Sequence, residues 1–239
     1  YKMKKNYYSI GYKKTLLIKN KNFMEPAENF IRIFKMNFLN KKKLNCLDFG
    51  VGDGRHTKFL LKKKHKVLAT DVSKIAISLS KKNIKKFDNY LILRNDNYEQ
   101  LLRFKKFDLI VCWETIHWIG DFDKIKYLLN IFKKSLNRKG NIIVTFPAED
   151  HYLIRNSNKL VRKHTFKVKQ IERKGALICA PKLNILKKIF KDNQLKILQI
   201  FKYSHGRLIF NNTKNDMKSG GLKKNSMFSM YAFLIEKNL

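Results

Sequence analysis

Alternate glycines follow a short apolar run in the first quarter of the chain, at Gly50, Gly52 and Gly54. Residues without Cβ atoms allow the backbone to turn tightly and to approach a ligand closely. The apolar positions predict a buried strand over 44–49 and a helix that begins near Arg55. The free N–H groups and the positive dipole end of that helix would face whatever lies over the glycines, so an anionic group is the natural ligand.

Three aspartates stand beside predicted strands. Asp48 lies two residues before the first glycine, Asp71 ends the apolar run 67–70, and Asp96 follows the run 90–93. In an open parallel sheet, ligands bind outside the carboxyl ends of the strands. An acid at the second strand tip can accept hydrogen bonds from both ribose hydroxyls, and an acid after the third can accept one from an adenine amino group. The pattern therefore suits a nucleoside.

Strand-like and helix-like segments alternate along the chain, which predicts parallel crossover units. We expect an α/β fold with a doubly wound, Rossmann-like, mostly parallel seven-stranded sheet and helices on both faces. The expected strands are 44–49, 67–70, 90–93, 107–112, 141–146, 195–203 and 227–235. The expected helices begin near Glu25, Arg55, Ser73, Asp121 and Leu183, and Gly140 is expected to stop the fourth of them.

The flanking segments have less regular patterns. Residues 1–40 are predicted to form an N-terminal lid or helical cap, in which Tyr7, Tyr8 and Tyr12 could close over a ligand. Residues 41–239 are predicted to form the main domain. After the fifth strand, the mixed polar and aromatic segment 148–180 is expected to be an insertion on the substrate side.

The net charge of +35 comes from 53 basic and 18 acidic residues. Such a charge usually indicates nucleic acid or an anionic surface. Here lysines dominate and are scattered over every predicted element, whereas a phosphate-binding track would favour clustered arginines. Nucleic acid therefore stays a possible partner that the sequence does not favour.

No apolar run is long enough to span a membrane, and the N-terminus lacks the apolar core of a secretion signal. We expect a cytoplasmic protein without a membrane span. The cysteines at positions 46, 112 and 179 are odd in number and widely spaced, which predicts reduced, buried, structural thiols and no metal site. The sequence does not indicate an oligomeric state.

The glycines read Gly-x-Gly-x-Gly with Asp48 two places ahead, whereas dinucleotide-binding proteins have Gly-x-Gly-x-x-Gly. With Asp96, the segment 113–118 and the two late strands, this pattern resembles the class I S-adenosylmethionine-dependent methyltransferases. Among them it is most similar to small-molecule enzymes of the ubiquinone-biosynthesis and tellurite-resistance types. The resemblance covers residues 44–147, with the flanks similar only in outline.

The resemblance implies S-adenosylmethionine as cofactor and gives each site residue a role. Gly50, Gly52 and Gly54 would line its methionine part, and Asp48 would hold either the turn or the ammonium group. Val51 is a further cofactor-binding residue. Asp71 would bind the ribose. The residues implied for the adenine are Val72, Asp96 and Asn97, and Trp113 would lie beside the sulfonium.

Methyl transfer from a sulfonium needs alignment of the acceptor and exclusion of water, and a hydroxyl or protonated amine acceptor also needs a base. The candidate bases near the strand ends are His117, His151, Glu114, Glu149 and Asp150. His117 is the first choice, since it follows the fourth strand by five residues, although a packing role against Trp118 is equally compatible. His151 is a candidate substrate contact.

The favoured function is methylation of an oxygen or nitrogen of a small-molecule acceptor. An RNA methyltransferase is an alternative that the charge supports. Against it, no Asn-Pro-Pro-Tyr type sequence follows the fourth strand to grip a flipped base, and no Pro-Cys pair offers a nucleophile. A non-catalytic protein that binds S-adenosylmethionine is a further alternative.

Overall fold

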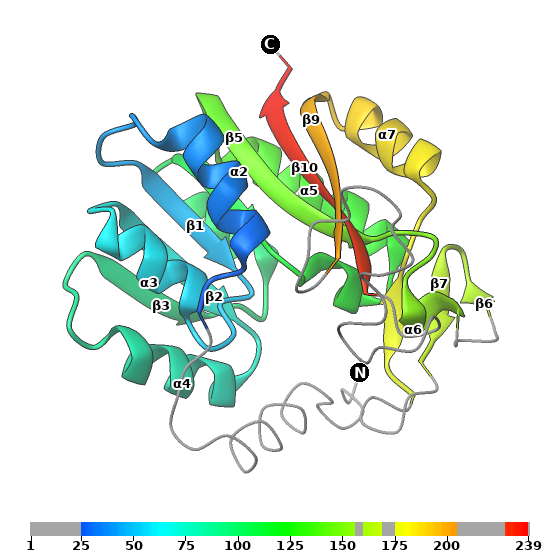
Figure 1. Ribbon diagram of the computed structural model, residues 1–239, viewed down its shortest axis with the longest axis horizontal. Coiled ribbons are helices and arrows are strands. Elements are labelled where there is room, and N and C mark those ends of the chain that lie inside the picture. The colour runs from blue at the N-terminus through cyan, green and yellow to red at the C-terminus, as the bar shows by residue number, and fades with distance from the viewer. Residues whose placement is uncertain (1–24, 156–159, 169–174, 205–227, 239) are drawn as a thin grey trace, which may run out of the picture. The chain divides into compact units, whose positions relative to one another are not determined.

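A computed structural model describes residues 25–155, 160–168, 175–204 and 228–238 (Figure 1). The predicted tyrosine lid lies outside these residues. The chain divides into two compact units, and each is described by itself. The first holds the chain up to Trp113 together with 131–142, and the second holds 114–130 and 143–238.

Seven strands form one mixed sheet in the order β3-β2-β1-β4-β5-β10-β9. Four of them belong to the first unit: β1 (Asn45–Phe49), β2 (Lys66–Asp71), β3 (Tyr90–Arg94) and β4 (Phe107–Cys112). β1 pairs in parallel with both β2 and β4, and β2 pairs in parallel with β3. The predicted α/β fold with a mostly parallel seven-stranded sheet is therefore confirmed. The N-terminal cap and the substrate-side insertion stay predictions.

Helices pack on both faces of β1. The helices of the first unit are α2 (Glu28–Phe38), α3 (Arg55–Lys62), α4 (Lys74–Ile84), the 3-10 helix η1 (Tyr98–Arg103) and the end of α5 (Phe122–Ser135). Neighbouring residues of a strand point to opposite faces. Asp48 contacts Thr57 of α3, whereas the ring of Phe49 lies 5.2 Å from that of Phe132 in α5. α3 and the end of α5 therefore cover opposite faces.

Local sequence explains where these helices begin. The Ser73 side chain accepts a hydrogen bond from the Ala76 N–H and caps α4, as the sequence predicts. α2 begins at Glu28 instead of Glu25, because Ala27 still has an extended backbone, with ψ 128°. A residue before proline is also disfavoured in a helix, which keeps Glu25 outside it.

Gly140 does not stop a helix, contrary to the prediction. α5 ends at Ser135, and Gly140 lies inside the strand β5 (Leu136–Pro147). A Cβ atom at Gly140 would lie 2.7 Å from the Phe107 carbonyl oxygen and 2.9 Å from Cδ2 of Leu136. The glycine is therefore needed for the close approach of β4 and not for a helix end.

A polar cluster holds the amino ends of three strands. Asp108, in β4, accepts hydrogen bonds from the Asn45 N–H at 2.8 Å and from the Asn137 side-chain amide. The Asn45 side chain in turn donates to the Lys106 carbonyl oxygen at 2.8 Å. These bonds tie the starts of β1, β4 and β5 at the edge opposite the glycines.

The second unit contains the antiparallel pair β9 (Leu195–Ser204) and β10 (Ser229–Lys237). A second sheet consists of three short antiparallel strands: β6 (Leu160–Arg162), β7 (Thr165–Lys167) and β8 (Leu177–Cys179). The helices of the second unit are η2 (Ile116–Ile119), α6 (Tyr152–Arg155), α7 (Leu183–Asp192) and the start of α5.

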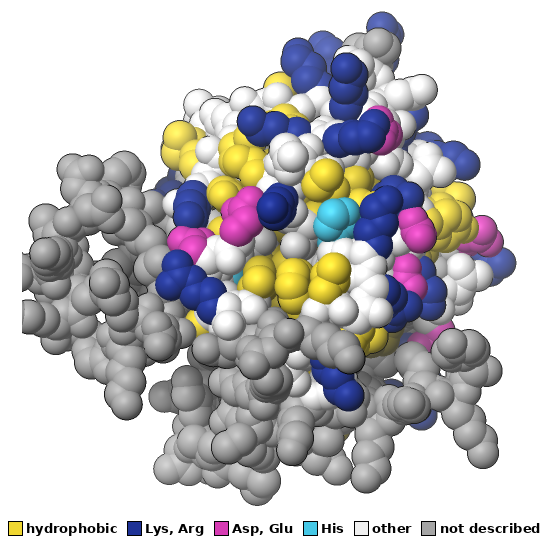
Figure 2. Space-filling model, turned by 90° about the vertical axis from the view of Figure 1, so that its right-hand side faces the viewer, with side chains coloured by type: hydrophobic (Ala, Val, Ile, Leu, Met, Phe, Trp, Pro, Cys, Tyr) yellow, Lys and Arg dark blue, Asp and Glu magenta, His cyan; other side chains and the backbone are white. Residues whose placement is uncertain are grey.

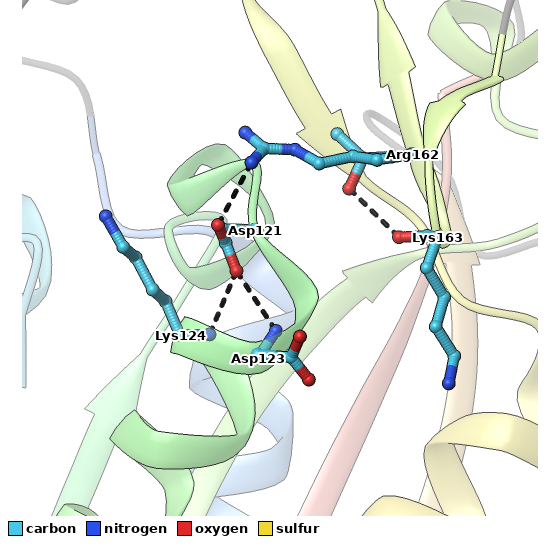
Figure 3. A network of polar contacts seen from close by, with 6 residues as sticks. Asp121, Asp123, Lys124, Arg162 and Lys163 are labelled. Carbon is cyan, nitrogen blue, oxygen red and sulfur yellow. Dashed lines mark hydrogen bonds and ion pairs between the residues drawn. The ribbon is translucent and has the colours of Figure 1, made fainter.

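Asp121 joins α5 to this small sheet (Figure 3). Its Oδ1 accepts hydrogen bonds from the backbone N–H groups of Asp123 and Lys124, each at 3.1 Å, and so caps α5. Its Oδ2 pairs with Arg162 of β6 at 3.1 Å. One carboxylate thus fixes both a helix start and a strand.

All three cysteines are reduced and buried, as predicted. Burial raises the pKa of the Cys46 thiol well above its ordinary value and that of Cys179 to about 12. Both thiols are therefore protonated at neutral pH. Among the described helices, none is long and apolar enough to cross a membrane.

Gly140→Ala should destabilise the protein by about 1–3 kcal/mol, because the new methyl group overpacks the backbone of β4. At an unobstructed position with a compatible backbone, the same change stabilises by about 0.4–1 kcal/mol. Urea unfolding measures the difference, with Lys139→Ala at the exposed neighbouring position as control. Equal stability of Gly140→Ala and wild type would contradict the close approach.

Candidate cofactor and active site

The glycine turn at the end of β1 requires left-handed backbone angles. Gly50, Gly52 and Gly54 have φ values of +82°, +59° and +84°, which L-residues with side chains rarely adopt. The N–H groups of Gly50 and Val51 both donate to the carbonyl oxygen of Thr70, at 2.8 and 2.9 Å. These bonds hold the turn against the carboxyl end of β2.

Asp71, the last residue of β2, also binds the glycine turn, through its side chain. Its Oδ2 accepts a hydrogen bond from the Gly52 N–H at 3.1 Å, and its Oδ1 accepts one from the Ser73 N–H at 2.8 Å. Burial raises the pKa of Asp71, although the backbone N–H donors oppose that effect. Each carboxylate oxygen can accept a further hydrogen bond, so the half-buried Asp71 can still receive ribose hydroxyls.

Asp48 is almost completely buried, with 1% of its surface exposed. Its Oδ2 accepts a hydrogen bond from the Thr57 hydroxyl at 2.6 Å, which ties β1 to the first turn of α3. Burial raises the pKa of Asp48 to about 6, against the hydrogen bonds from Thr57 that lower it. A nearby cation would favour the ionised form. Its predicted contact with an ammonium group stays a prediction.

The polar residues after β3 occupy three different environments. Asp96 is exposed and pairs with Arg94 at 3.0 Å, and the Asn97 side chain caps η1 by accepting the Glu99 N–H at 2.9 Å. Asn95 has 2% of its surface exposed. Neither its side-chain nitrogen nor its side-chain oxygen has a hydrogen-bond partner within the described part of the chain. Its own N–H donates to the Asp71 carbonyl oxygen at 3.0 Å.

The unpaired buried amide next to Asp71 is a candidate ligand contact, because buried polar groups are almost always hydrogen-bonded. Sequence reasoning missed Asn95. The only signal was its place in the polar run that follows the third strand, and the run alone does not show which member is buried.

Trp113, which follows β4, lies in an aromatic cluster of the first unit. Its ring is 5.7 Å from Phe30 of α2 and 6.0 Å from His56 of α3. Nε2 of His56 accepts a hydrogen bond from the Ala27 N–H at 3.4 Å, so the imidazole is an acceptor there. Burial and the neighbouring Arg55 lower the pKa of His56 well below its ordinary value, which keeps it neutral.

Both predicted catalytic histidines are buried in the second unit. His117 is 3% exposed, and its ring lies 5.1 Å from that of Trp118. His151 is 1% exposed, stacks on Tyr152 at 4.9 Å, and accepts the Leu153 N–H on Nδ1 at 3.1 Å. These contacts give each ring a packing role; their catalytic roles stay predictions.

The acids after β5 are committed to partners within the second unit. Glu149 accepts the Leu183 N–H at 2.9 Å and the Tyr231 hydroxyl at 2.8 Å. Burial raises the pKa of Glu149, but these donors outweigh it and leave the pKa lowered. Asp150 pairs with Lys202 at 2.8 Å. In the described ranges, no three His, Cys, Asp or Glu side chains are grouped as metal ligands would be.

The sequence matches the family model described as "Methyltransferase domain" over residues 20–200. A comparison with curated protein sequences found no match. Among solved structures, a protein from Methanosarcina mazei described as a SAM-dependent methyltransferase has 14% identity and a TM-score of 0.67, over 90% of this chain and 100% of that one. A similarly described Clostridium acetobutylicum protein has 17% identity and a TM-score of 0.57, over 88% and 98%.

The N-methyltransferase NodS from Bradyrhizobium japonicum, solved with S-adenosylhomocysteine, has 14% identity and a TM-score of 0.62, over 98% of each chain. At these identities the structures establish the fold. The family model covers most of the sequence, and the chain belongs to the class I S-adenosylmethionine-dependent methyltransferases. The turn, the Asp71 carboxylate and the unpaired Asn95 amide are of the chemical kinds that suit the nucleoside part of that cofactor.

Asp48→Asn should flatten the pH dependence of stability between about pH 4 and pH 6. The folded-state pKa of about 6 lies above the unfolded value, so the stability that Asp48 contributes is full below pH 4 and is lost as the pH rises through 6. The wild type should lose about 3 kcal/mol more than Asp48→Asn over this window.

Urea unfolding at a series of pH values measures this difference, and Asp96→Asn is the matched control at an exposed site. Parallel curves for wild type and Asp48→Asn would show that Asp48 is not the titrating group.

Proposed function

We propose that this protein transfers the methyl group of S-adenosylmethionine to an oxygen or nitrogen of a small-molecule acceptor. The observation that carries the proposal is the glycine turn, in which the Gly52 N–H donates to the Asp71 carboxylate at 3.1 Å. At this point a backbone without side chains lies beside an acid. A plain turn would not need three left-handed glycines beside a carboxylate. The methyltransferase family supports the reaction type.

In this proposal, different residues of the chain bind different parts of the cofactor. The glycine turn and Val51 pack against the methionine part, and Asp48 is the counter-ion of its ammonium group. Asp71 accepts the ribose hydroxyls, as its open lone pairs allow. Trp113 lies beside the sulfonium. When bound, S-adenosylmethionine supplies an electrophilic methyl group and leaves as a neutral thioether.

We assign the adenine edge to Asn95 as well as to Val72, Asp96 and Asn97. An amide offers a donor and an acceptor together, which matches the paired groups of adenine. Asn95 is the buried member of the polar run, whereas the Asp96 carboxylate is exposed and already paired with Arg94.

The described residues on one face of the molecule suit a small acceptor better than RNA. On the face drawn in Figure 2, Lys and Arg side chains are interspersed with hydrophobic and acidic ones instead of forming one unbroken track. A phosphate-binding surface would gather its cations. NodS is described as an N-methyltransferase, which is a precedent for nitrogen as the acceptor on this fold.

Calorimetric titration with S-adenosylhomocysteine, NADH and a short single-stranded RNA at physiological salt tests the proposal. Micromolar binding of S-adenosylhomocysteine without the other two is the expected result. Binding of NADH or of RNA alone would overturn the assignment of the glycine turn. Tight binding of both RNA and S-adenosylhomocysteine would favour an RNA methyltransferase instead.

Asn95→Ala should weaken S-adenosylhomocysteine binding by about 1–2 kcal/mol, through loss of hydrogen bonds to the base. The control ligand is S-inosylhomocysteine, whose base has an oxo group in place of the amino group. Equal weakening toward both ligands would remove Asn95 from base recognition.

His117→Gln should leave S-adenosylhomocysteine affinity unchanged and slow turnover by roughly 10²–10⁴-fold, if the imidazole removes a proton from the acceptor. A pH–rate profile is the decisive measurement, since the variant should lose the limb of the profile that reports ionisation of the base. The same substitution at His151 tests the second histidine. Wild-type turnover in His117→Gln would assign the ring to packing alone.

A further inference from the structure

The glycine turn of the first unit has a further anchor besides the two at the end of β2, and this anchor lies in α4. The side-chain amide of Asn83, the last residue but one of that helix, donates to the Asp53 carbonyl oxygen at 3.0 Å. Asp53 stands between Gly52 and Gly54. Asn83 therefore binds the turn itself, although it lies 30 residues further along the chain.

The hydrogen bonds of the Asn83 amide fix which of its atoms faces the turn. Its Oδ1 accepts a hydrogen bond from the Lys58 ammonium group of α3 at 3.0 Å. A lysine side chain can only donate and a carbonyl oxygen can only accept, so a flipped amide would lose both bonds. With 9% of its surface exposed, Asn83 joins α3, α4 and the glycine turn through one side chain.

Asn83 holds one particular peptide unit, the one between Asp53 and Gly54. The carbonyl oxygen of this unit accepts the Asn83 amide, and its N–H donates to the Val51 carbonyl oxygen at 2.9 Å. The Gly54 carbonyl oxygen accepts the Lys58 N–H at 2.8 Å, at the start of α3. The orientation of this peptide unit therefore affects both the turn and the beginning of the helix.

The helix α4 also packs directly on the turn. A Cβ atom at Gly54 would lie 3.0 Å from Cβ of Ser80, a fully buried residue about one helical turn before Asn83. Glycines have more backbone freedom than other residues, so a turn with three of them loses much entropy when it becomes ordered. A tether that already orders the turn in the ligand-free protein reduces the entropy that ligand binding must still remove.

We propose that Asn83 is a positioning residue for the cofactor, because it holds the Asp53–Gly54 peptide in the orientation that receives the methionine part of S-adenosylmethionine. The inference rests on the proposed binding of that part by the glycine turn. Asn83 acts through the turn and not by contact with the cofactor. Asparagine is also a poor helix former, so helix propensity does not account for its place in α4.

Asn83→Asp isolates the bond to the turn. The carboxylate can still accept the Lys58 ammonium group, but it has no N–H to donate to the Asp53 carbonyl oxygen. Calorimetry should show that S-adenosylhomocysteine binds about 10-fold more weakly than to wild type. The affinity for 5′-methylthioadenosine, which has the nucleoside and the sulfur but lacks the amino acid part, should stay unchanged. A general loss of order at the site would weaken both ligands.

Asn37→Asp is the matched control in the same unit. The Asn37 amide donates to the Ile33 carbonyl oxygen of α2 at 2.9 Å, so this variant loses the same kind of bond and gains the same charge. It should bind both ligands as wild type does. Lys58→Met removes the other bond of Asn83 and keeps the bond to the turn, so its affinity for S-adenosylhomocysteine should stay within about threefold of wild type.

Asn83→Ala removes the bond to the turn without adding a charge, and it replaces Asn83→Asp in the test if circular dichroism shows that the latter does not fold. Wild-type affinity for S-adenosylhomocysteine in a folded Asn83 variant would overturn the inference, as would equal weakening of both ligands. An effect of Lys58→Met as large as that of the Asn83 variant would also overturn it, since the contact between the helices would then be the important one.

If neither Asn83 variant folds, the residue supports the fold as a whole and the inference is again wrong. In all these cases the methyltransferase proposal stands. Failure of the wild type to bind S-adenosylhomocysteine would instead overturn the proposed function, and the role of Asn83 with it.

Discussion

The hydrogen bond from the Gly52 N–H to the Asp71 carboxylate joins the ends of the two central strands of the first unit. The turn that brings Gly52 there is possible only because glycines accept positive φ. Thr70 fixes the same turn with its carbonyl oxygen, and Asp71 fixes the next helix through the Ser73 N–H. A strand end, a turn and a helix start are thus set before any ligand binds, which lowers the entropic cost of binding.

Unfavourable features gather at the carboxyl edge of the sheet. There, a carboxylate (Asp48) is desolvated and an amide (Asn95) lacks a partner among the described residues. Glu114 adds a strained backbone just beyond the same edge of β4. At the amino edge, by contrast, Asp108 has donors on both oxygens. A desolvated carboxylate and an unpaired amide at one edge, opposite a fully paired aspartate at the other, are the pattern expected of a functional edge.

Much of the architecture follows from the sequence, because local signals and buried periodicity agree. Ser73 caps its helix as expected, and β4 has the predicted bounds. Gly140 was misread because a glycine after an apolar helical run looks like a helix stop, whereas the contact that requires it comes from Phe107, far away in sequence. Long-range contacts of this kind have no local signature.

The candidate site was predictable in part for the same reason. The glycine turn and its contact with Asp71 depend on backbone geometry that the spacing reveals. Asn95 stands out by its burial and Glu114 by its backbone angle, and neither property is visible in residue type. Likewise, the sequence named His151 as a substrate contact, but only the structure shows the Leu153 N–H that already occupies its Nδ1.

The three buried thiols make the native protein a poor target for alkylating reagents and for peroxide, since both attack the exposed thiolate. Protonation of Cys46 and Cys179 reinforces this shielding. A single cysteine introduced on the surface would then be the most reactive thiol of the chain and would take a fluorophore or spin label without removal of the natural three. The protein is thus suited to spectroscopic work with its own core left intact.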